Sequence, residues 1–381
     1  MVTSRFLTRR SLFRLAAALS GAAMLPRCGF DPEEGAAYTP WSFPDPTRAP
    51  LLQVVHAGLL AANPHDTQPW RFVVTPDRVR VFVDRARSLG AMDPLGRERI
   101  IGLGCAIENM VVWAPEVGLV ATVVARPDPD SPDLVADVLL ATAKSPRSEL
   151  AGGLARRKTH RGRYGEFPLD PALGRELGRL ASDPVVALTT LTDARMDTFR
   201  DGTRRATRAI VDDAEMNDAS HAWYRHTKEE IDRHRDGLTL DAQSLGAFTT
   251  AAGKTLGRPS AADAGGYWIA NTEEVHTGPV TAFAILSTRA LEDVGELLQV
   301  GRVYQRLHLF AAREGLAMQP LNQLPERRDR ERQKGLRPDL EPVLASLAEG
   351  HAQMAFRIGV AWDDTHHSPR RPVEWVTEVT S

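Results

Sequence analysis

Residues 61–70 of the chain read AANPHDTQPW. Apolar side chains recur at helical spacing over residues 51–62, and residues 71–75 have the composition of a strand. The quoted stretch is therefore predicted to be a loop that leaves a helix at Asn63-Pro64 and enters a strand. It carries amide, imidazole, carboxylate and hydroxyl groups within a few positions. Because loops hold binding residues more often than the elements they join, we expect a flat ligand with polar edges here.

The beginning of the chain has the pattern of an export signal. Arg9-Arg10 precede a short apolar run over residues 15–25, which includes several small residues. This order is typical of a secretory signal, and the paired arginines favour the twin-arginine export machinery. The run is shorter than the roughly 20 apolar residues that a membrane-spanning helix needs, so no transmembrane span is expected. We predict a twin-arginine signal over residues 1–30 and a periplasmic or cell-envelope location.

The chain contains two cysteines. Cys28 follows Arg27, whereas lipid-attachment sites prefer small residues before the cysteine, so we interpret it as an incidental part of the signal; a lipid anchor at Cys28 is the alternative. Cys105 is then left without a partner for an internal disulfide. Within its apolar helical pattern, it is predicted to be a small buried hydrophobe.

Composition indicates an ordinary globular protein. The chain has 381 residues, of which 43% are hydrophobic and 25% charged, and it is long enough for two domains or one duplicated domain. A net charge of −2, without a basic stripe interleaved with aromatics, argues against a nucleic-acid partner. Residues 326–332 mix charges of both signs and are predicted to be a solvated surface segment.

Periodicity divides the chain into two helix–strand halves, at residues 51–145 and 150–381. The proline-rich residues 31–50 are predicted to be an extended arm or linker. In the first half we expect a hairpin whose strands are residues 71–75 and 79–84. A long helix over residues 93–114, capped by Asp93 and with Pro94 in its first turn, should follow. A buried strand is expected over residues 120–125.

In the second half, helical and strand patterns alternate less regularly. Helices are expected over residues 148–158, 171–181, 193–216 and 291–315, and strands over 281–288 and 355–362. Residues 245–266 are rich in glycine, alanine and serine and are predicted to be a mobile loop, a candidate lid. The chain has no GxGxxG or P-loop motif, which disfavours a Rossmann domain.

Four separated motifs, in order, resemble the single-chain, Acg-type branch of the nitroreductase-like FMN-binding flavoproteins. The motifs are at residues 63–70, 93–109, 156–164 and 315–323, the last joined by 368–372. The resemblance spans about residues 40–376. It implies an α+β fold in which two related nitroreductase-like halves pack as an internal pseudo-dimer, with one FMN between them.

The resemblance assigns the FMN phosphate to arginines from distant parts of the sequence. Arg157 and Arg161 would share one face if their segment is helical, and guanidinium groups can bind phosphate oxygens in a forked geometry. Arg370 or Arg371 would reach the same phosphate from the other end of the chain. The alternative for each is a surface ion pair, and Arg163 is interpreted in that way.

The polar edge of the flavin ring needs hydrogen-bonding side chains. Asn63, Asp66 and Gln68 are the candidates from the first half. Asn322 and Gln323 are the candidates from the second half, near the reactive N5 of the ring. The alternative for Asn63 and Asp66 is that they only cap and turn the loop. Trp70 is predicted to be a core anchor.

Asp66 departs from the family pattern, which usually has asparagine in a His-Asn-Thr-Gln-Pro-Trp loop. An ionised carboxylate only accepts hydrogen bonds, whereas an amide also donates. Beside a ring that becomes anionic on reduction, the charge of Asp66 is expected to weaken FMN binding and hinder reduction. On this hypothesis, Asp66→Asn should bind FMN more tightly and raise the midpoint potential.

Histidines do not suggest a metal site. The spacing of His221, His226 and His234 fits no zinc motif, so they are predicted to lie on a solvated helix face, and His366-His367 in a polar tail.

The predicted function is an exported flavoprotein oxidoreductase that passes electrons or hydride through FMN from a small-molecule donor to a small-molecule acceptor. Because the cofactor performs such chemistry, no catalytic residue is named. The alternatives are a non-catalytic FMN storage or sequestration protein and a flavin-free partner-binding domain.

Overall fold

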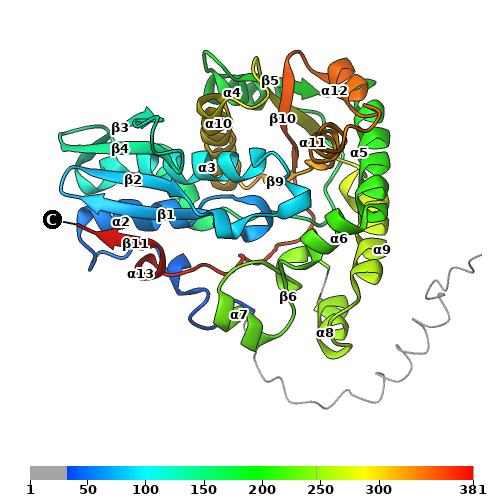
Figure 1. The fold of residues 1–381 in the computed structure, drawn as a ribbon, viewed down its shortest axis with the longest axis horizontal. Coiled ribbons are helices and arrows are strands. Elements are labelled where there is room, and N and C mark those ends of the chain that lie inside the picture. The colour runs from blue at the N-terminus through cyan, green and yellow to red at the C-terminus, as the bar shows by residue number, and fades with distance from the viewer. Residues whose placement is uncertain (1–31, 246, 381) are drawn as a thin grey trace, which may run out of the picture. The chain divides into compact units, whose positions relative to one another are not determined.

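The hairpin that follows the 61–70 loop begins the first β-sheet. β1 (Trp70–Thr75) and β2 (Arg78–Val83) pair antiparallel, and their buried positions alternate, as expected for a sheet with one covered face. β4 (Leu134–Thr142) and then β3 (Leu119–Ala125) continue the sheet. At the other edge, β11 (Thr377–Val379) pairs parallel with β1, so the C-terminal segment completes the sheet of the first half (Figure 1).

The computed structural model describes residues 32–380 apart from Gly246. Residues 35–381 belong to one compact unit. The predicted export signal at residues 1–30, with Cys28, lies outside the described residues.

The second sheet has the order β5 (Ala187–Leu191), β8 (Ala282–Thr288), β10 (His351–Gly359) and β9 (Ala317–Pro320), with antiparallel neighbours. Every residue of β8 is buried, because both faces of this sheet are covered. Ala284 and Leu286 pack in the cluster that contains the long helix α10 (Val294–Arg313). Phe283 and Ile285 point the other way, into a cluster with Phe199. A short parallel pair, β6 (Tyr224–Arg225) and β7 (Leu238–Thr239), lies apart from both sheets.

Helices fill the space between and around the sheets (Figure 1). The helices nearest the first sheet are α2 (Pro50–Leu59) and α3 (Arg97–Trp113). The remaining helices are α4 (Pro171–Ala181), α5 (Arg195–Asp212), α6 (Ala214–His221), α7 (Lys228–His234), α8 (Ala247–Thr255), α9 (Ala261–Asn271), α11 (Gln323–Lys334), α12 (Glu341–Leu347) and α13 (Val373–Val376). The predicted α+β fold with two helix–sheet halves is confirmed.

The helices α3 and α10 meet backbone to backbone through a glycine from each. A Cβ added at Gly104 would lie 2.1 Å from the carbonyl oxygen of Leu298, and one added at Gly301 would lie 2.0 Å from that of Ile101. Each glycine thus faces the carbonyl about one helical turn before the other glycine. The contact is reciprocal, as in an interface between two copies related by a two-fold axis. Cys105, buried as predicted, donates to the carbonyl of Gly301 at 3.2 Å.

Helix α3 begins later than the sequence suggests. Gly96, with φ of 69°, is its N-terminal cap, and Arg97 is its first residue. The side chain of Asp93 still caps the helix, since it accepts the backbone N–H groups of Glu98 at 3.0 Å and Arg99 at 2.9 Å. Pro94 therefore lies in the turn before the helix and not in its first turn.

Other expectations are corrected by the structure. Residues 245–266 are largely helical, in α8 and the start of α9, because alanine favours helix and outweighs the scattered glycines. Residues 148–158 hold only a short 3-10 helix, Ala151–Arg156, and residues 193–216 break at Asp213 into α5 and α6. The strand at 120–125, predicted as buried, is an edge strand with several exposed positions. Residues 35–49 are not a free arm, since Ala37, Tyr38 and Pro40 are buried.

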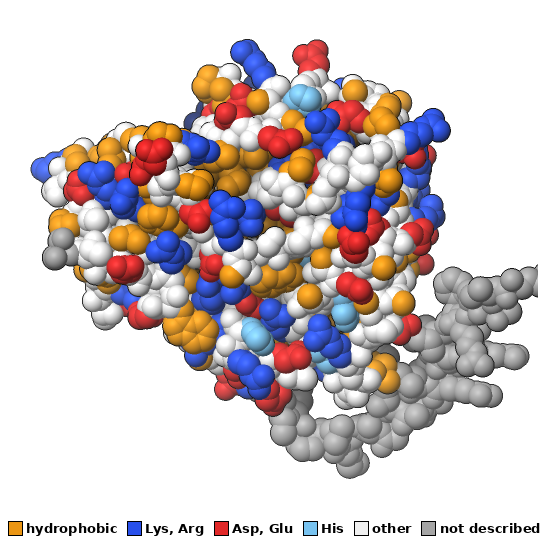
Figure 2. Space-filling view, in the orientation of Figure 1, with side chains coloured by type: hydrophobic (Ala, Val, Ile, Leu, Met, Phe, Trp, Pro, Cys, Tyr) orange, Lys and Arg blue, Asp and Glu red, His pale blue; other side chains and the backbone are white. Residues whose placement is uncertain are grey.

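The mixed-charge run at residues 326–332 is also not a solvated surface. It lies in α11, where most of its side chains are buried. Asp329 bridges Arg97 at 2.6 Å and Arg328 at 2.7 Å, so the buried charges are paired across two helices. On the visible outer face, acidic and basic side chains are interspersed (Figure 2).

Among the described residues, one helical stretch, Arg97–Val117, is long and apolar enough to cross a membrane. Of its most apolar window, 67% is buried inside the protein. This burial is what a core helix requires.

The glycine contact gives a test of how the halves are held together. Gly301→Ala would force the methyl group against the backbone of α3, where no side chain can move aside, and should lower the free energy of unfolding by about 2 kcal/mol or more. Gly178→Ala is the control, because its Cβ would meet nothing within 4 Å on the exposed face of α4. It should stabilise the protein by about 0.5–1 kcal/mol. Urea denaturation of both variants checks this, and equal stabilities would contradict the close helix contact.

Candidate functional site

The loop at residues 61–70 has an unusual backbone. His65, Asp66 and Gln68 have φ values of 46°, 53° and 49°, in the left-handed region that non-glycine residues rarely occupy. Each such residue costs about 1–3 kcal/mol unless its surroundings impose the conformation. Asn63 helps to impose it, because its side chain accepts the N–H of Gln68 at 2.7 Å and donates to Asp66 at 3.2 Å. Asn63 and Asp66 therefore have the turn-forming role considered as the alternative.

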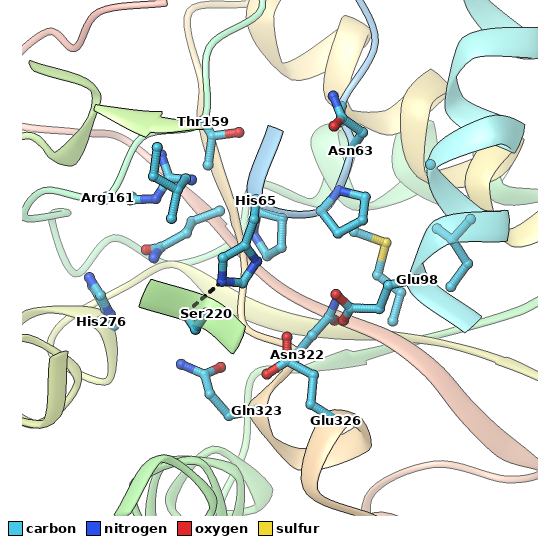
Figure 3. Close-up of a pocket in the computed structure, with 18 of the residues that line it drawn as sticks. Asn63, His65, Glu98, Thr159, Arg161, Ser220, His276, Asn322, Gln323 and Glu326 are labelled. Atoms are coloured by element: carbon cyan, nitrogen blue, oxygen red, sulfur yellow. Dashed lines mark hydrogen bonds between the residues drawn. The ribbon is translucent and has the colours of Figure 1, made fainter. Parts of the chain in front are cut away.

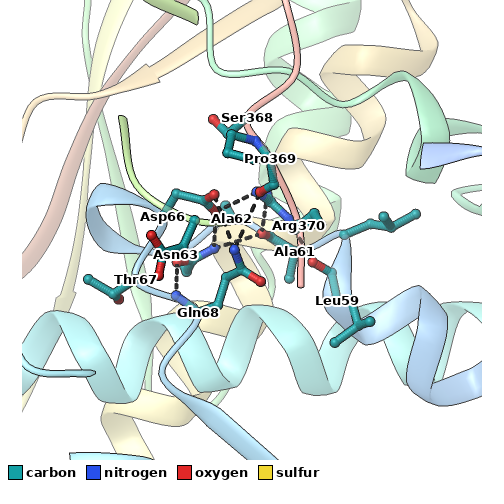
Figure 4. A network of polar contacts seen from close by, with 12 residues as sticks. Leu59, Ala61, Ala62, Asn63, Asp66, Thr67, Gln68, Ser368, Pro369 and Arg370 are labelled. Carbon is teal, nitrogen blue, oxygen red and sulfur yellow. Dashed lines mark hydrogen bonds and ion pairs between the residues drawn. The ribbon is translucent and has the colours of Figure 1, made fainter. Parts of the chain in front are cut away.

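Residues 369–371 of the C-terminal segment contact this loop and hold it in place, and we call these contacts the clamp (Figure 4). The guanidinium of Arg370 donates to the carbonyls of Leu59 at 2.7 Å and Ala61 at 3.1 Å and forms an ion pair with Asp66. The side chain of Gln68 accepts the backbone N–H of Arg371 at 2.9 Å, and Arg371 in turn donates to the carbonyl of Gln68. Neither Gln68, which is fully buried, nor Arg371 lines a cavity. The structure thus places both side chains in the contact between the loop and the C-terminal segment.

The side chain of Asp66 also contacts the C-terminal segment, through Arg370. Its carboxylate accepts hydrogen bonds from Arg370 and from the amides of Asn63 and Gln68, while burial disfavours its charged form. The expected repulsion of a reduced ring and the expected gain from Asp66→Asn stay predictions. The sequence could not reveal this partner, which is 304 positions away.

A cavity lies beside the loop and between the two halves of the chain. Together with the open solvent at its mouth, it spans about 1,020 Å³. Its walls come from the loop, from α3 and from the second half (Figure 3), and its main lining residues are Asn63, Pro64, His65, Glu98, Ile101, Gly102, Thr159, Arg161, Ser220, Tyr224, Trp268, His276, Gln319, Asn322, Gln323, Glu326 and Met354. We call this space the central cavity. Of the predicted site residues, Asn63, Arg161, Asn322 and Gln323 lie on its wall.

A smaller cavity shares Asn63, Thr159 and Arg161 with the central cavity, and we call it the basic cavity. Arg157 and Arg370 also line it, so three of the arginines predicted to converge do so. Asp66 lies on its wall as well.

The segment that carries Arg157 and Arg161 is extended, not helical as the spacing argument assumed. Thr159, between them, forms a parallel bridge with Met318 of β9. In an extended chain every second residue points to the same side, so residues 157, 159 and 161 can still face one cavity. A spacing of four residues places two side chains on the same side of a helix and also of an extended chain. Arg157 and Arg161 can therefore share a face although their segment is not helical.

Burial shapes the charge of these arginines. Burial and the nearby Arg370 lower the pKa of Arg157 to about 10, so its guanidinium remains charged at neutral pH. It donates twice to the carbonyl of Leu60, at 3.0 and 3.1 Å, and Arg161 donates to the carbonyl of Ala242 at 3.0 Å. The ring of Trp41 lies 5.7 Å from the guanidinium carbon of Arg157 and 5.0 Å from that of Arg370.

Several cavity residues were not anticipated. The imidazole of His65 is hydrogen-bonded to the hydroxyl of Ser220 at 2.9 Å, and burial lowers its pKa to about 4. His276 ends a π-helical turn, Thr272–His276, and burial and Arg357 lower its pKa well below the usual value. Glu98 was within a motif noted in the sequence, but Glu326 was hidden in a run that charge patterning assigned to the surface. No sequence signal marks the π-helical turn.

The other histidines do not form one helix face. His221 ends α6, His226 follows β6 and His234 ends α7. Among the described residues, no group of three or more His, Cys, Asp or Glu side chains could hold a metal ion. His367, expected in a polar tail, is buried, stacks on Trp41 with ring centroids 4.0 Å apart and lines the basic cavity.

Comparisons with known proteins agree with this picture in part. No protein-family model matches the chain. "Putative NAD(P)H nitroreductase Rv3131" of Mycobacterium tuberculosis is 30% identical over 138 residues, which are 36% of this chain and 40% of that protein. "Putative NAD(P)H nitroreductase acg" of the same organism is 32% identical over 82 residues, 22% of this chain and 25% of that protein. The chain thus matches less than half the length of these curated relatives.

Among solved structures, the FMN and NADPH-dependent nitroreductase NfnB from Sphigopyxis sp. strain HMH aligns with a TM-score of 0.40 and 17% identity, over 61% of this chain and 99% of that chain. The named sequence relatives support a nitroreductase-like family for this chain.

Asp66 gives a pH-dependent test of the loop clamp. Burial raises its pKa from 3.8 to about 6, although Arg370 and Asn63 act in the opposite direction. The folded protein therefore holds this proton more tightly than the unfolded chain, and the stability it contributes is lost as the pH rises from about 4 through 6. Between pH 4 and 7 the parent protein should lose about 2 kcal/mol of unfolding free energy that Asp66→Asn does not lose.

Urea denaturation across this pH range measures the difference. Asp218→Asn, at an exposed position of α6, is the control and should follow the parent. Parallel pH dependences of the parent and Asp66→Asn would show that Asp66 is not the buried carboxyl described here.

Proposed function

We propose that the protein is an exported, FMN-binding flavoprotein that acts as an oxidoreductase. The observation that supports this most directly is the basic cavity. Arg157 is a buried guanidinium whose hydrogen bonds go to a carbonyl group, and among the described residues no carboxylate forms an ion pair with it. A buried charge without a counter-ion is costly, so a cavity beside it favours an anionic ligand. The phosphate dianion of FMN has the required charge and oxygen acceptors.

The central cavity suits the remainder of FMN. It adjoins the basic cavity through Asn63, Thr159 and Arg161, as a ring joined to a phosphate requires. Pro64, Ile101 and Met354 offer apolar surface for the faces of a flat ring, while Asn322 and Gln323 offer amides for its polar edge. When bound, FMN supplies two-electron hydride chemistry, and the residues of the chain bind it and exclude water.

The fused, Acg-type arrangement is part of this proposal. The reciprocal contact of Gly104 and Gly301 and the pairing of β11 with β1 are what one chain imitating a homodimer would need. The match to the protein named acg adds support. The names of the relatives suggest a nicotinamide nucleotide as the donor. An exported protein would meet little of it, so we propose a different small-molecule donor in the natural setting.

Storage or sequestration of FMN is the second candidate function. It is favoured by α9, which places Trp268 on the wall of the central cavity, next to the segment that was considered as a lid. The two functions differ in one simple observation. If the purified protein is yellow and NADPH under nitrogen bleaches it, the flavin is accessible to a donor; a yellow protein that resists NADPH and dithionite alike would favour storage.

The phosphate site predicts a selective loss of FMN binding. Arg161→Ala removes a guanidinium that lines both cavities, and each charge-assisted hydrogen bond is worth about 1.5–3 kcal/mol. We expect the Kd for FMN, measured by fluorescence quenching, to rise about tenfold or more. Arg163→Ala is the matched control, because Arg163 is exposed and lines neither cavity. Equal affinities of the two variants would place the phosphate elsewhere.

The export proposal has its own test. Replacing both Arg9 and Arg10 by lysine should leave the protein in the cytoplasm, because the twin-arginine machinery reads the arginine pair. Cell fractionation followed by immunoblotting measures the distribution. Periplasmic recovery equal to that of the parent would contradict this route.

A further inference from the structure

Two carboxyl groups face each other on one wall of the central cavity. Glu98 comes from the first turn of α3, and Glu326 comes from the first turn of α11. Both line the cavity and are nearly fully buried, with 5% and 6% of their surface exposed. Figure 3 shows them together with Asn322, on the side of the cavity away from Arg161 and His276.

The two groups are close enough to share a proton. The Glu98 and Glu326 side chains lie within reach of each other, with Asn322 beside them (Figure 3), and Asn322 is held by accepting the backbone N–H of Ala355 at 2.9 Å. Two carboxylates cannot form a hydrogen bond to each other unless one of them carries a proton. One oxygen of Glu98 and one of Glu326 are buried without any hydrogen-bond partner in the protein, so solvent does not stabilise a second negative charge.

The surrounding charges act on the pair from three elements. Arg97 of α3 lies 3.5 Å from Glu98 and favours its ionised form, but Arg97 is shared with Asp329 of α11 at 2.6 Å. Asp93, in the turn before α3, adds a negative charge. Burial and Asp93 together raise the pKa of Glu98 to about 7 against the effect of Arg97. Burial and the neighbouring Glu98 raise the pKa of Glu326.

The other titratable groups on the cavity wall are poorly suited to giving up a proton near neutral pH. Burial lowers the pKa of His65 to about 4, and that of His276 also falls well below its usual value, so both are neutral. Burial raises the pKa of Tyr224 and that of Cys105, which makes both weaker acids. Among the described cavity residues, the Glu98–Glu326 pair therefore holds the proton that is most easily released.

We infer that Glu98 and Glu326 share one proton and donate it to the substrate that is reduced in the central cavity. This inference rests on the proposed flavin function. The acceptor is a molecule with a nitro, carbonyl or quinone oxygen that takes up a hydride from the reduced flavin. When the acceptor receives a hydride at the atom double-bonded to this oxygen, the electron pair of the double bond would move onto the oxygen, and the oxygen would take the shared proton. The pair is left with two negative charges and regains a proton from water at the cavity mouth.

The proton itself can be observed without turnover. In full-length protein with carbon-13-labelled glutamate, NMR of the parent should show two carboxyl resonances that titrate together, well above the usual pH range of a glutamate. Glu98→Gln and Glu326→Gln should each abolish this titration. Glu108→Gln is the matched control, since Glu108 is equally buried on α3 but pairs with Arg302 at 2.8 Å and does not line the cavity. It should retain the titration.

Its use in reduction is tested by stopped-flow oxidation of the reduced holoprotein with nitrofurazone. In the parent, the rate should fall as the pH rises through about 7, because the pair loses its proton. Glu98→Gln and Glu326→Gln should bind FMN like the parent but react at least about tenfold more slowly at pH 6, with no such pH dependence. Glu108→Gln should behave like the parent.

The outcomes separate the two proposals. Titration of both carboxyls below pH 5, or rates of both cavity variants within about twofold of the parent, would overturn the proton-donor inference and leave the flavin function standing. A parent protein that binds no FMN would overturn the proposed function, and the reductive role of the pair with it.

Discussion

The backbone contact between α3 and α10 at Gly104 and Gly301 is the constraint on which the remaining architecture depends. Because no side chain separates the two helices there, the halves of the chain approach as closely as main chains allow. The contact is extended by buried amides: Gln305 of α10 donates to Asn109 of α3 at 2.7 Å, and Asn109 donates to the carbonyl of Ala57 in α2 at 2.8 Å. Three helices are thereby fixed to one another. The fixed helices include Ile101 and Gly102, which form part of the central cavity wall.

The same amide chain leads to the loop that shapes the site. Gln305 also accepts the backbone N–H of Ala62 at 3.3 Å, where α2 ends and the loop begins. From the opposite side, Arg370 holds the carbonyls of Leu59 and Ala61. The left-handed conformations of His65, Asp66 and Gln68 thus lie between a helix of the second half and the C-terminal segment. Strain of this kind is retained where the surroundings impose it, and here both restraints come from the other half of the chain.

The helices and strands that carry clear signals within their own residues were predicted correctly from the sequence. The helix at residues 171–181 and the hairpin around residues 76–77 match α4, β1 and β2 closely, because a capping Asp170 and an alternating strand pattern are local signals. The strands β4, β5, β6, β7, β9 and β11 were missed, and residues 245–266 were expected to be a loop. A strand buried on both faces lacks alternation, and short edge strands depend on their neighbours.

The residues of the candidate site could also be predicted only in part. The convergence of Arg157, Arg161 and Arg370 on one cavity could be anticipated from the family resemblance, because the residue types match the ligand. The roles of Gln68, Arg371 and Asp66 could not, because their partners lie about 300 residues away in the sequence. Glu326 was assigned to the surface because charge alternation does not distinguish a solvated helix from one whose charges are paired inside the protein. Only tertiary contacts make that distinction.

The pairing of β11 with β1 has a consequence for how the protein acquires its structure. The strand that completes the first sheet is synthesised about 300 residues after its partner, since Thr377 pairs with Phe72. Contacts between such distant residues slow folding, since a long loop must close before they form. The first half can therefore form only an incomplete sheet, and the 61–70 loop lacks its arginine clamp, until residues 370–379 have been synthesised. The basic cavity, which Arg370 lines, is thus completed late, and a chain that stopped before β11 would present an open sheet edge along β1.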